Sequence, residues 1–252
     1  MVDWDGAGYA RVSALQRAMV DEALSGLTLS GDEAVLDVGC GDGYLTHRLT
    51  ALVPRGWVVG VDASARMISA ARAAADAASY AVADARHLPF DARFDVVTSF
   101  NALHWVPEQH QALGRLAAAL RPGGRAVIQV VCAGPRTSLE SVAMQVTAAP
   151  RWAGSFAGFT APFVHVDPAG YADLAAVAGL HADRVTVTDR HWDFGSREPL
   201  TRWCAVGLSA WTDRLPADLR ADFVGDTVRG YEDVTGQPGL FRFMQLRAEL
   251  SR

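Results

Sequence analysis

The sequence predicts an α/β fold built around a mainly parallel sheet. Short apolar runs alternate along the chain with segments that have helical spacing, and this alternation is typical of βαβ units. The run VLDV (35–38) leads directly into GCGDG (39–43), which holds three glycines in five residues. A strand, a glycine-rich turn and a helix in this order commonly bind a nucleotide-type cofactor. Two such cofactors fit, NAD(P) and S-adenosylmethionine (SAM).

Composition and charge exclude several other classes of protein. Half of the 252 residues are hydrophobic and a fifth are charged, as in ordinary globular enzymes. The net charge of −5 argues against non-specific binding of nucleic acid. No apolar run reaches the roughly 18 to 20 residues that span a bilayer, and the opening MVDWDGAGYARV lacks the pattern of a signal peptide. We therefore expect a cytoplasmic protein.

Three cysteines, Cys40, Cys132 and Cys204, lie far apart and form no CxxC or Cys/His cluster. Neither a zinc site nor a disulfide framework is predicted from this pattern, and an odd number suits a reducing compartment. We expect three packing thiols and no bound metal.

The predicted elements follow one another without repeats or a low-complexity linker, so we treat residues 1–252 as a single domain. Helices are expected at 64–77, which opens with a serine cap, at 107–120, which opens with proline, and from Asp167 to Gly179. Arg121 to Gly124 should end the second helix. Strands are expected at 34–39, 57–61, 79–83, 94–99, 125–131, 184–194 and 241–250.

Two segments, 133–162 and 196–236, do not fit the alternation of strands and helices. Both follow strands, at the sheet edge where α/β proteins bind ligands. They are candidates for a lid over a substrate pocket. The alternative is that they simply cover the end of the sheet.

The glycine spacing helps to choose between the two cofactors. A dinucleotide fingerprint, G-x-G-x-x-G, would place its third glycine at Tyr44, whereas this chain has Gly43. Asp37 and Asp42 flank the loop, and carboxylates repel a pyrophosphate. SAM has no phosphate and carries a sulfonium and an ammonium group. The electrostatics favour SAM over NAD(P).

Acidic residues also lie at or near the ends of the next two predicted strands. Asp62 lies about 20 residues beyond the glycines and can accept both ribose hydroxyls of either cofactor. Asp84 can accept from an adenine amino group while the backbone N–H of Ala85 donates to the ring. Each acid alone could be a solvated loop residue, but the series with Asp37 favours a shared ligand.

The chain resembles the class I SAM-dependent methyltransferase family. The motifs occur in family order: VLDVGCGDG (35–43), VVGVD (58–62), ADARHLPF (83–90), FDVVTSFNALHWV (94–106) and LRPGGRAVI (120–128). The resemblance implies a Rossmann-like sheet of seven strands in the order 3-2-1-4-5-7-6, with the last strand antiparallel, and a helical cap. It also implies S-adenosylhomocysteine as the product.

The resemblance further implies how SAM is held. Gly39 and Gly41 would pass beneath its methionine portion, with Asp37 towards the amino group, Asp62 on the ribose and Met67 near the adenine. The full set of expected cofactor contacts is Asp37, Gly39, Cys40, Gly41, Asp62, Ala63, Met67, Asp84, Ala85 and Asn101.

The stretch SFNALHWVPEQH (99–110) is similar to the corresponding part of the juvenile hormone acid and trans-aconitate methyltransferases, which make methyl esters. The opening WDGAGYARVSALQ (4–16) is similar to a segment that folds over the active site there, which makes residues 1–20 a third part of the cap. The resemblance implies that Gln16 and Trp105 contact the substrate carboxylate, with Tyr9 as a further candidate.

One departure from that group concerns the substrate. A tricarboxylate needs several cationic partners, and residues 133–160 offer only Arg136 and Arg151. Aromatic residues are frequent there instead, which favours a lipophilic carboxylic acid or another small natural product. The aromatic residues are Trp152, Phe156 and Phe159, with Phe163 just beyond the segment.

The role of His104 separates the alternatives. A carboxylate nucleophile needs no base, whereas a phenol, amine or carbon acid usually needs a proton removed. His104 could be such a base in a natural-product O-, N- or C-methyltransferase, or it could line the pocket or be structural. Trp105 could likewise be a core residue. A non-catalytic SAM-binding module is the remaining alternative.

Overall fold

Seven strands form one sheet in the order β3-β2-β1-β4-β5-β7-β6. The computed structural model describes residues 14–74 and 77–252. Five strands run parallel: β1 (Ala34–Val38), β2 (Trp57–Asp62), β3 (Ser79–Val82), β4 (Phe94–Phe100) and β5 (Leu120–Val131). The last strand, β7 (Leu240–Ser251), is antiparallel to both β5 and β6 (His181–Asp193). The predicted order and the antiparallel last strand are confirmed.

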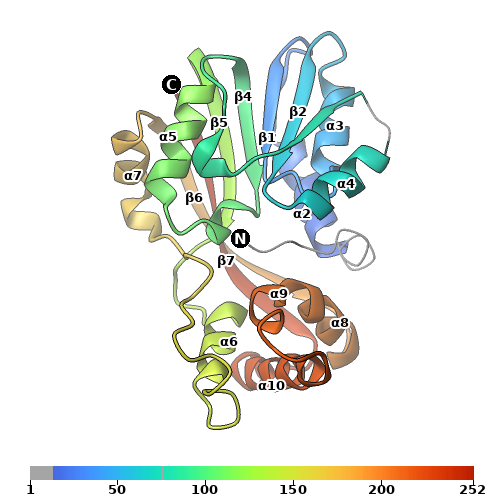
Figure 1. Cartoon of the computed structure of the whole chain (residues 1–252). Coiled ribbons are helices and arrows are strands. Elements are labelled where there is room, and N and C mark those ends of the chain that lie inside the picture. The colour runs from blue at the N-terminus through green and yellow to red at the C-terminus, as the bar shows by residue number, and fades with distance from the viewer. Residues whose placement is uncertain (1–13, 75–76) are drawn as a thin grey trace.

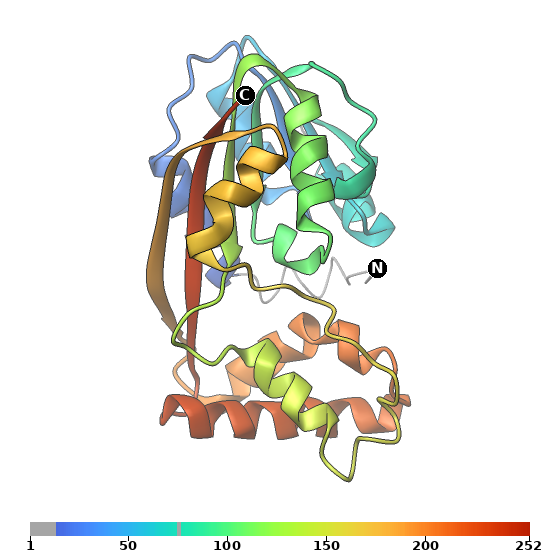
Figure 2. The same ribbon diagram turned by 90° about the vertical axis from the view of Figure 1, so that its left-hand side faces the viewer.

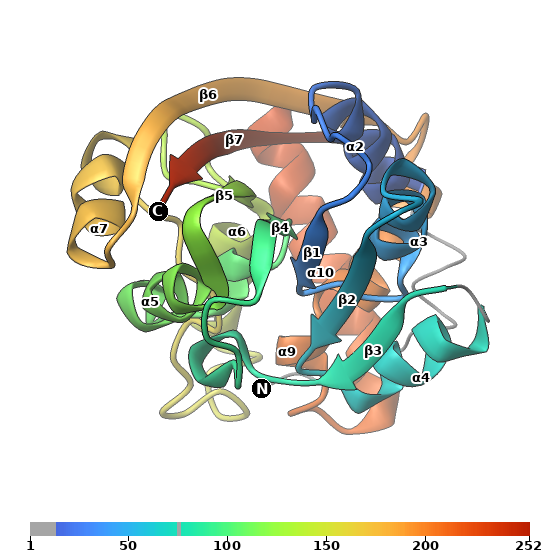
Figure 3. The ribbon, with the colours of Figure 1, turned by 90° about the horizontal axis from the view of Figure 1, so that it is seen from above.

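Helices cover both faces of the sheet, as Figure 3 shows from above. One face carries α2 (Ala14–Ser25), α3 (Tyr44–Leu52) and α4 (Ala65–Ala73), and the other carries α5 (Gln109–Ala119) and α7 (Tyr171–Val177). All five residues of β1 are buried. This is expected because a parallel strand covered on both faces needs apolar side chains on both.

One expected boundary is wrong. Residues 121–124 were expected to separate the helix from a strand at 125, but β5 already begins at Leu120. Leu120 pairs with Phe94, and the next pair is Arg125 with Val96. The intervening Arg-Pro-Gly-Gly turn therefore bulges out of the ladder instead of ending it, which a local turn pattern does not reveal.

A helical lobe lies beyond one end of the sheet (Figures 1 and 2). It contains α6 (Leu139–Thr147), α8 (Arg197–Gly207), α9 (Ser209–Thr212) and α10 (Ala217–Thr235). The segments 133–162 and 196–236 supply these helices. Of the segment 1–20, residues 14–20 belong to α2, and residues 1–13 lie outside the described residues. That these segments act as a lid stays a prediction.

The lobe has its own apolar core, which we call the lobe cluster. Phe241 and Phe243 of β7, and Leu15 and Met19 of α2, also belong to it, so the long last strand and the first described helix tie the lobe to the sheet. The lobe's own buried members include Val142, Trp152, Phe156, Leu200, Cys204, Trp211, Phe223, Val228 and Tyr231.

The cysteines Cys40, Cys132 and Cys204 are all buried and free of disulfides. In the described ranges, 14–74 and 77–252, no helix is long and apolar enough to cross a bilayer. Within the same ranges no group of three or more potential side-chain ligands could hold a metal ion.

Candidate active site

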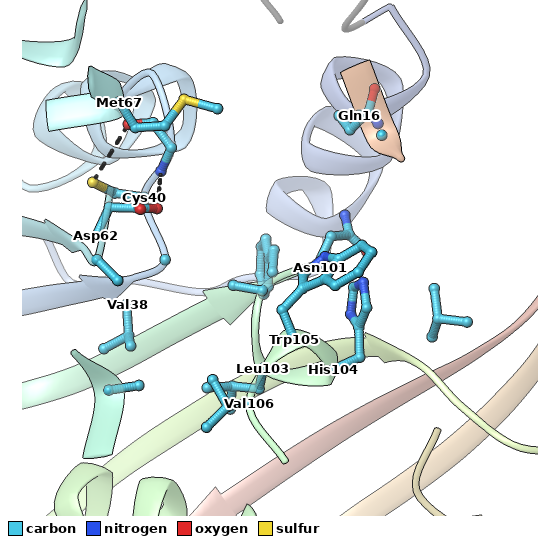
Figure 4. A pocket seen from close by; sticks show the side chains of 18 of the residues that line it. Gln16, Val38, Cys40, Asp62, Met67, Asn101, Leu103, His104, Trp105 and Val106 are labelled. Atoms are coloured by element: carbon cyan, nitrogen blue, oxygen red, sulfur yellow. Dashed lines mark hydrogen bonds between the residues drawn. The ribbon is translucent and has the colours of Figure 1, made fainter. Parts of the chain in front are cut away.

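A cavity of about 460 Å³ opens between the carboxyl ends of the parallel strands and the helical lobe. All the candidate site residues that the structure describes line it, from Gln16 to Trp105. Tyr9 lies outside the described residues. Figure 4 shows Cys40, Asp62 and Met67 on one side of the cavity and Gln16, His104 and Trp105 on the other. We call these the cofactor side and the acceptor side.

The glycine loop after β1 leaves open space on the cofactor side. Gly39 and Gly41 have φ angles of 76° and 56°, a region that favours glycine. A Cβ on Gly39 would lie 2.1 Å from Cβ of Ala102, whereas a Cβ on Gly41 would meet no atom of the described residues within 4 Å. Gly39 is therefore required by the protein's own packing. Gly41 keeps its space clear for something else.

The carboxylate of Asp62 is fixed by backbone donors. Its Oδ2 accepts from the N–H of Gly41 at 3.0 Å and its Oδ1 from the N–H of Ser64 at 2.8 Å. Each carboxylate oxygen accepts more than one hydrogen bond. The group is thus held in place at the tip of β2 and can still accept from a ligand hydroxyl.

Asp37 is almost completely buried, with 1% of its surface exposed. Its carboxylate accepts from the hydroxyl of Thr46 at 2.6 Å and from the hydroxyl of Thr98 at 3.2 Å. Burial is the main cause that raises the pKa of Asp37 to about 7, and the two hydroxyls oppose it. A cation placed nearby would favour the ionised form.

Asn101 is strained and has an unused acceptor. Its φ is 57°, which is uncommon for a residue with a side chain. Its backbone N–H donates to the carbonyl of Gln129 at 2.7 Å. Its buried Oδ1 has no hydrogen-bond partner among the residues that the structure describes, so it is available to a ligand donor. An ammonium group fits it well, and with Asp37 and the open face of Gly41 the cofactor side suits SAM.

Asp84 is more heavily engaged than the sequence indicated. Its carboxylate pairs with the guanidinium of Arg86 at 2.6 Å and accepts from the Arg86 N–H at 2.9 Å. Hydrogen bonding to Arg86 lowers the pKa of Asp84. Arg86 also reaches Glu108 at 2.8 Å. Sequence reasoning missed the pair of Arg86 and Glu108. An acid at the start of a helix, such as Glu108, is usually explained by the helix dipole alone.

On the acceptor side, His104 is a neutral imidazole. It is 5% exposed, and burial, with a smaller contribution from His165, lowers its pKa to about 3. Its Nδ1 has no hydrogen-bond partner within the described part of the chain. The adjacent Trp105 packs edge-on against Trp211, with ring centroids 6.3 Å apart.

Gln16 and Trp203 meet across the acceptor side. The indole N–H of Trp203 donates to Oε1 of Gln16 at 3.3 Å, which leaves the amide NH₂ of Gln16 to face a ligand. The ring of Trp203 also packs on Phe241, with centroids 4.8 Å apart. Glu140 of α6 lines the cavity too. It was missed because an acid in the first turn of a helix is usually explained by the helix dipole.

The four aromatic residues that suggested a lipophilic substrate do not line the cavity. Trp152 and Phe156 are buried in the lobe cluster, and Phe159 and Phe163 pack against it. Apolar side chains do line the acceptor side, but they come from other elements. These are Leu139, Val206, Leu208, Phe241 and Phe243, together with Trp105 and Trp203.

Few cations border the cavity. Arg136 pairs with Asp189, and Arg151 pairs with Asp222; neither arginine lines it. Among the described lining residues, Arg17 and Arg86 are the two with a guanidinium group. The acceptor side is therefore mainly apolar.

Comparison with known proteins agrees with this geometry. Residues 35–124 match the profile of a family described as methyltransferase domain. A trans-aconitate 2-methyltransferase of Variovorax paradoxus is 32% identical over 232 residues, covering 91% of this chain and 89% of the relative. A trans-aconitate 2-methyltransferase of Methylobacterium radiotolerans is 30% identical, with 92% and 90% covered.

Solved structures show the same fold at lower identity. The YcgJ protein of Bacillus subtilis has a TM-score of 0.65 at 17% identity, covering 93% of this chain and 98% of that chain. A phosphoethanolamine N-methyltransferase of Haemonchus contortus, solved with S-adenosylhomocysteine, has a TM-score of 0.62 at 16% identity, covering 98% and 56%. The sheet order, the cavity and the similarity over nine-tenths of the chain lead to one conclusion: this chain belongs to the class I SAM-dependent methyltransferases.

Proposed function

We propose that this enzyme transfers the methyl group of SAM to a carboxylate oxygen of a small, mainly apolar acid, giving a methyl ester and S-adenosylhomocysteine. The observation that carries this proposal is the burial of His104. An imidazole whose pKa is about 3 is a weak base at neutral pH, so the site suits an acceptor that needs no deprotonation. A carboxylate is such an acceptor.

Residues on the cofactor side would hold SAM by groups that the fold has already oriented. Asp62 would accept from the ribose hydroxyls, and Asn101 and Asp37 would face the ammonium group. SAM supplies an electrophilic methyl group when bound. The remaining proposed contacts are Gly39, Cys40, Gly41, Ala63, Met67, Asp84 and Ala85.

Residues on the acceptor side would align the carboxylate. The free amide NH₂ of Gln16 and the N–H groups of His104 and Trp105 are donors suited to carboxylate oxygens. Holding a nucleophile in line and excluding water accounts for much of the acceleration of such a displacement. Catalysis would then come from positioning, and Tyr9 stays a candidate by resemblance.

The substrate is proposed to differ from the tricarboxylate that is named for the relatives. Each additional carboxylate would need a cation, whereas Glu140 lines the cavity and the basic group beside it in the described residues is the imidazole of His165. Apolar side chains dominate the acceptor side. We propose an acid with one carboxylate to be methylated and a largely apolar body, processed in the cytoplasm without a nucleic-acid partner.

The test uses methyl-labelled SAM with a panel of carboxylic acids, phenols and amines, followed by mild base. Label transferred to an acid and released by base as methanol is the expected result. Label transferred to a phenol or amine and stable to base would overturn ester formation. It would also restore proton removal by His104 as the alternative.

A further inference from the structure

Glu140 is a buried carboxylate on the lobe side of the cavity, and the mechanism above does not use it. It lies in the first turn of α6, is 7% exposed, and lines the cavity. The cap of this helix is Ser138, whose hydroxyl accepts from the N–H of Ser141 at 3.0 Å. Capping therefore does not explain why a carboxylate is buried at position 140.

No donor among the described residues satisfies this carboxylate. The nearest basic side chain among the described residues is His165. Its Nε2 lies 3.8 Å from Oε2 of Glu140, which is too far for a hydrogen bond. That Nε2 is itself buried without a partner in the described part of the chain. Burial lowers the pKa of His165, so His165 does not supply a full compensating charge at neutral pH.

A buried carboxylate without a donor is unfavourable unless something else donates to it. The cavity is the direction from which a donor can come, because Glu140 and His104 both line it. His165 lies close to Glu140 and also influences His104. The carboxylate of Glu140 is therefore open to a donor that a ligand on the acceptor side brings into the cavity.

We propose that the acceptor carries, besides the carboxylate that is methylated, a hydrogen-bond donor, either a hydroxyl or an ammonium group, and that Glu140 binds this donor. The inference rests on the proposed function. Glu140 is then a specificity-determining residue: it selects a hydroxy acid or an amino acid with an apolar body, and fixes which end of the acceptor enters the lobe.

The experiment compares three matched series of straight-chain acids with six, eight and ten carbons: unsubstituted, ω-hydroxy and ω-amino. Methyl transfer is measured with wild type, Glu140→Gln and Glu140→Leu. The expected wild-type result is a kcat/KM about tenfold higher for a donor-bearing acid than for the unsubstituted acid of the same length. Glu140→Leu should abolish this preference.

Glu140→Gln distinguishes the two donors. The amide oxygen of Gln still accepts from a hydroxyl but has no charge for an ammonium, so a preference for ω-hydroxy acids should survive and one for ω-amino acids should be lost. The matched control is Glu198→Gln, which neutralises an exposed carboxylate on α8 that pairs with Arg202. Equal SAM affinity of all variants, by calorimetry, shows that the fold is intact.

Three outcomes count against the inference. If wild type methylates unsubstituted acids at least as well as both donor-bearing acids at every length, Glu140 does not select a donor, although ester formation itself stands. A preference that persists in Glu140→Leu would assign the selection to other residues. If wild type binds SAM but methylates none of the acids, the proposed function fails, and this inference fails with it.

Discussion

Burial decides what His104 can do, and the sequence motif alone left that open. The motif that holds His104 allowed a base, a pocket wall or a structural residue. In the structure His104 is buried, which lowers its pKa to about 3 and leaves the imidazole neutral. That value depends on the lobe and on His165, which lies far away in sequence, so no local pattern could have given it.

A substitution at His104 tests the positioning role. His104→Asn keeps a donor and should lower kcat/KM by about tenfold, whereas loss of a general base costs about a hundredfold or more. Because the folded-state pKa is about 3, the wild-type pH profile of kcat/KM should show no ionisation of this group between pH 6 and 8. A bell-shaped profile or a rising limb between pH 6 and 8 that is absent from the variant would contradict a positioning role for His104.

The raised pKa of Asp37 predicts a pH dependence of cofactor binding. In the free protein its pKa is raised to about 7, and the positive groups of SAM favour the carboxylate, so binding releases a proton. The affinity for SAM should therefore rise as pH increases from 5.5 to 7, by up to about tenfold per pH unit. Calorimetry at each pH measures this directly, and Asp37→Asn should bind more weakly with a flat profile. A wild-type profile as flat as the variant's would contradict the assignment.

At the scale of elements, the two glycines of the loop after β1 should respond differently to substitution. Gly39 is needed for packing, and Gly41 is proposed to leave space for the cofactor. Gly39→Ala should lower the free energy of unfolding by about 3 kcal/mol or more, because its Cβ would lie 2.1 Å from Cβ of Ala102. Gly41→Ala should lower it by about 1–2 kcal/mol, the cost of a left-handed residue, yet reduce SAM affinity by at least tenfold.

Chemical denaturation and calorimetry on the two alanine variants check these expectations. The pair acts as its own control, since the substitution is the same and the two positions are two residues apart. Gly41→Ala with wild-type affinity for SAM would show that the space beside Gly41 does not hold the cofactor.

Strand and loop positions were predictable because apolar runs and glycine spacing are local signals. The strand order came from the family resemblance and is confirmed. The lobe was less predictable. Its aromatic residues Trp152 and Phe156 pack on Phe223 of α10, a long-range contact that turned expected substrate contacts into core residues. The bulge at 121–124 was missed because its pairing partners, Phe94 and Val96, are set by the fold. The pair of Arg86 with Glu108 is likewise formed across 22 residues.

At the scale of the molecule, the buried apolar residues form the lobe cluster and two clusters along the sheet, which we call together the sheet core. Leu116 of α5 is completely buried in the sheet core, and Trp211 is completely buried in the lobe cluster, against Trp105. Cofactor residues follow the strands of the sheet core, while much of the acceptor side belongs to the lobe. Damage to the two cores should therefore affect different kinetic parameters.

Trp211→Leu and Leu116→Ala form the matched pair. Both should lower the free energy of unfolding by about 3 kcal/mol. Only Trp211→Leu should raise the KM for the acceptor severalfold, because Trp105 loses its packing partner, and SAM affinity should stay within twofold in both. Denaturation curves and steady-state kinetics on one acid substrate provide the readout. An equal rise in acceptor KM in both variants would refute the division.

The position of β7 has a consequence for synthesis of the chain. β6 pairs with β7 alone among the described strands, and α8, α9 and α10 are all translated between the two. While those helices emerge, β6 is an open edge, and the lobe still lacks Phe241 and Phe243. The last two of the seven strands and the acceptor side of the cavity must therefore form together, late and from distant segments. This makes the step slow and the waiting intermediate prone to aggregation. Chaperone demand during translation should accordingly concentrate on the stretch between β6 and β7.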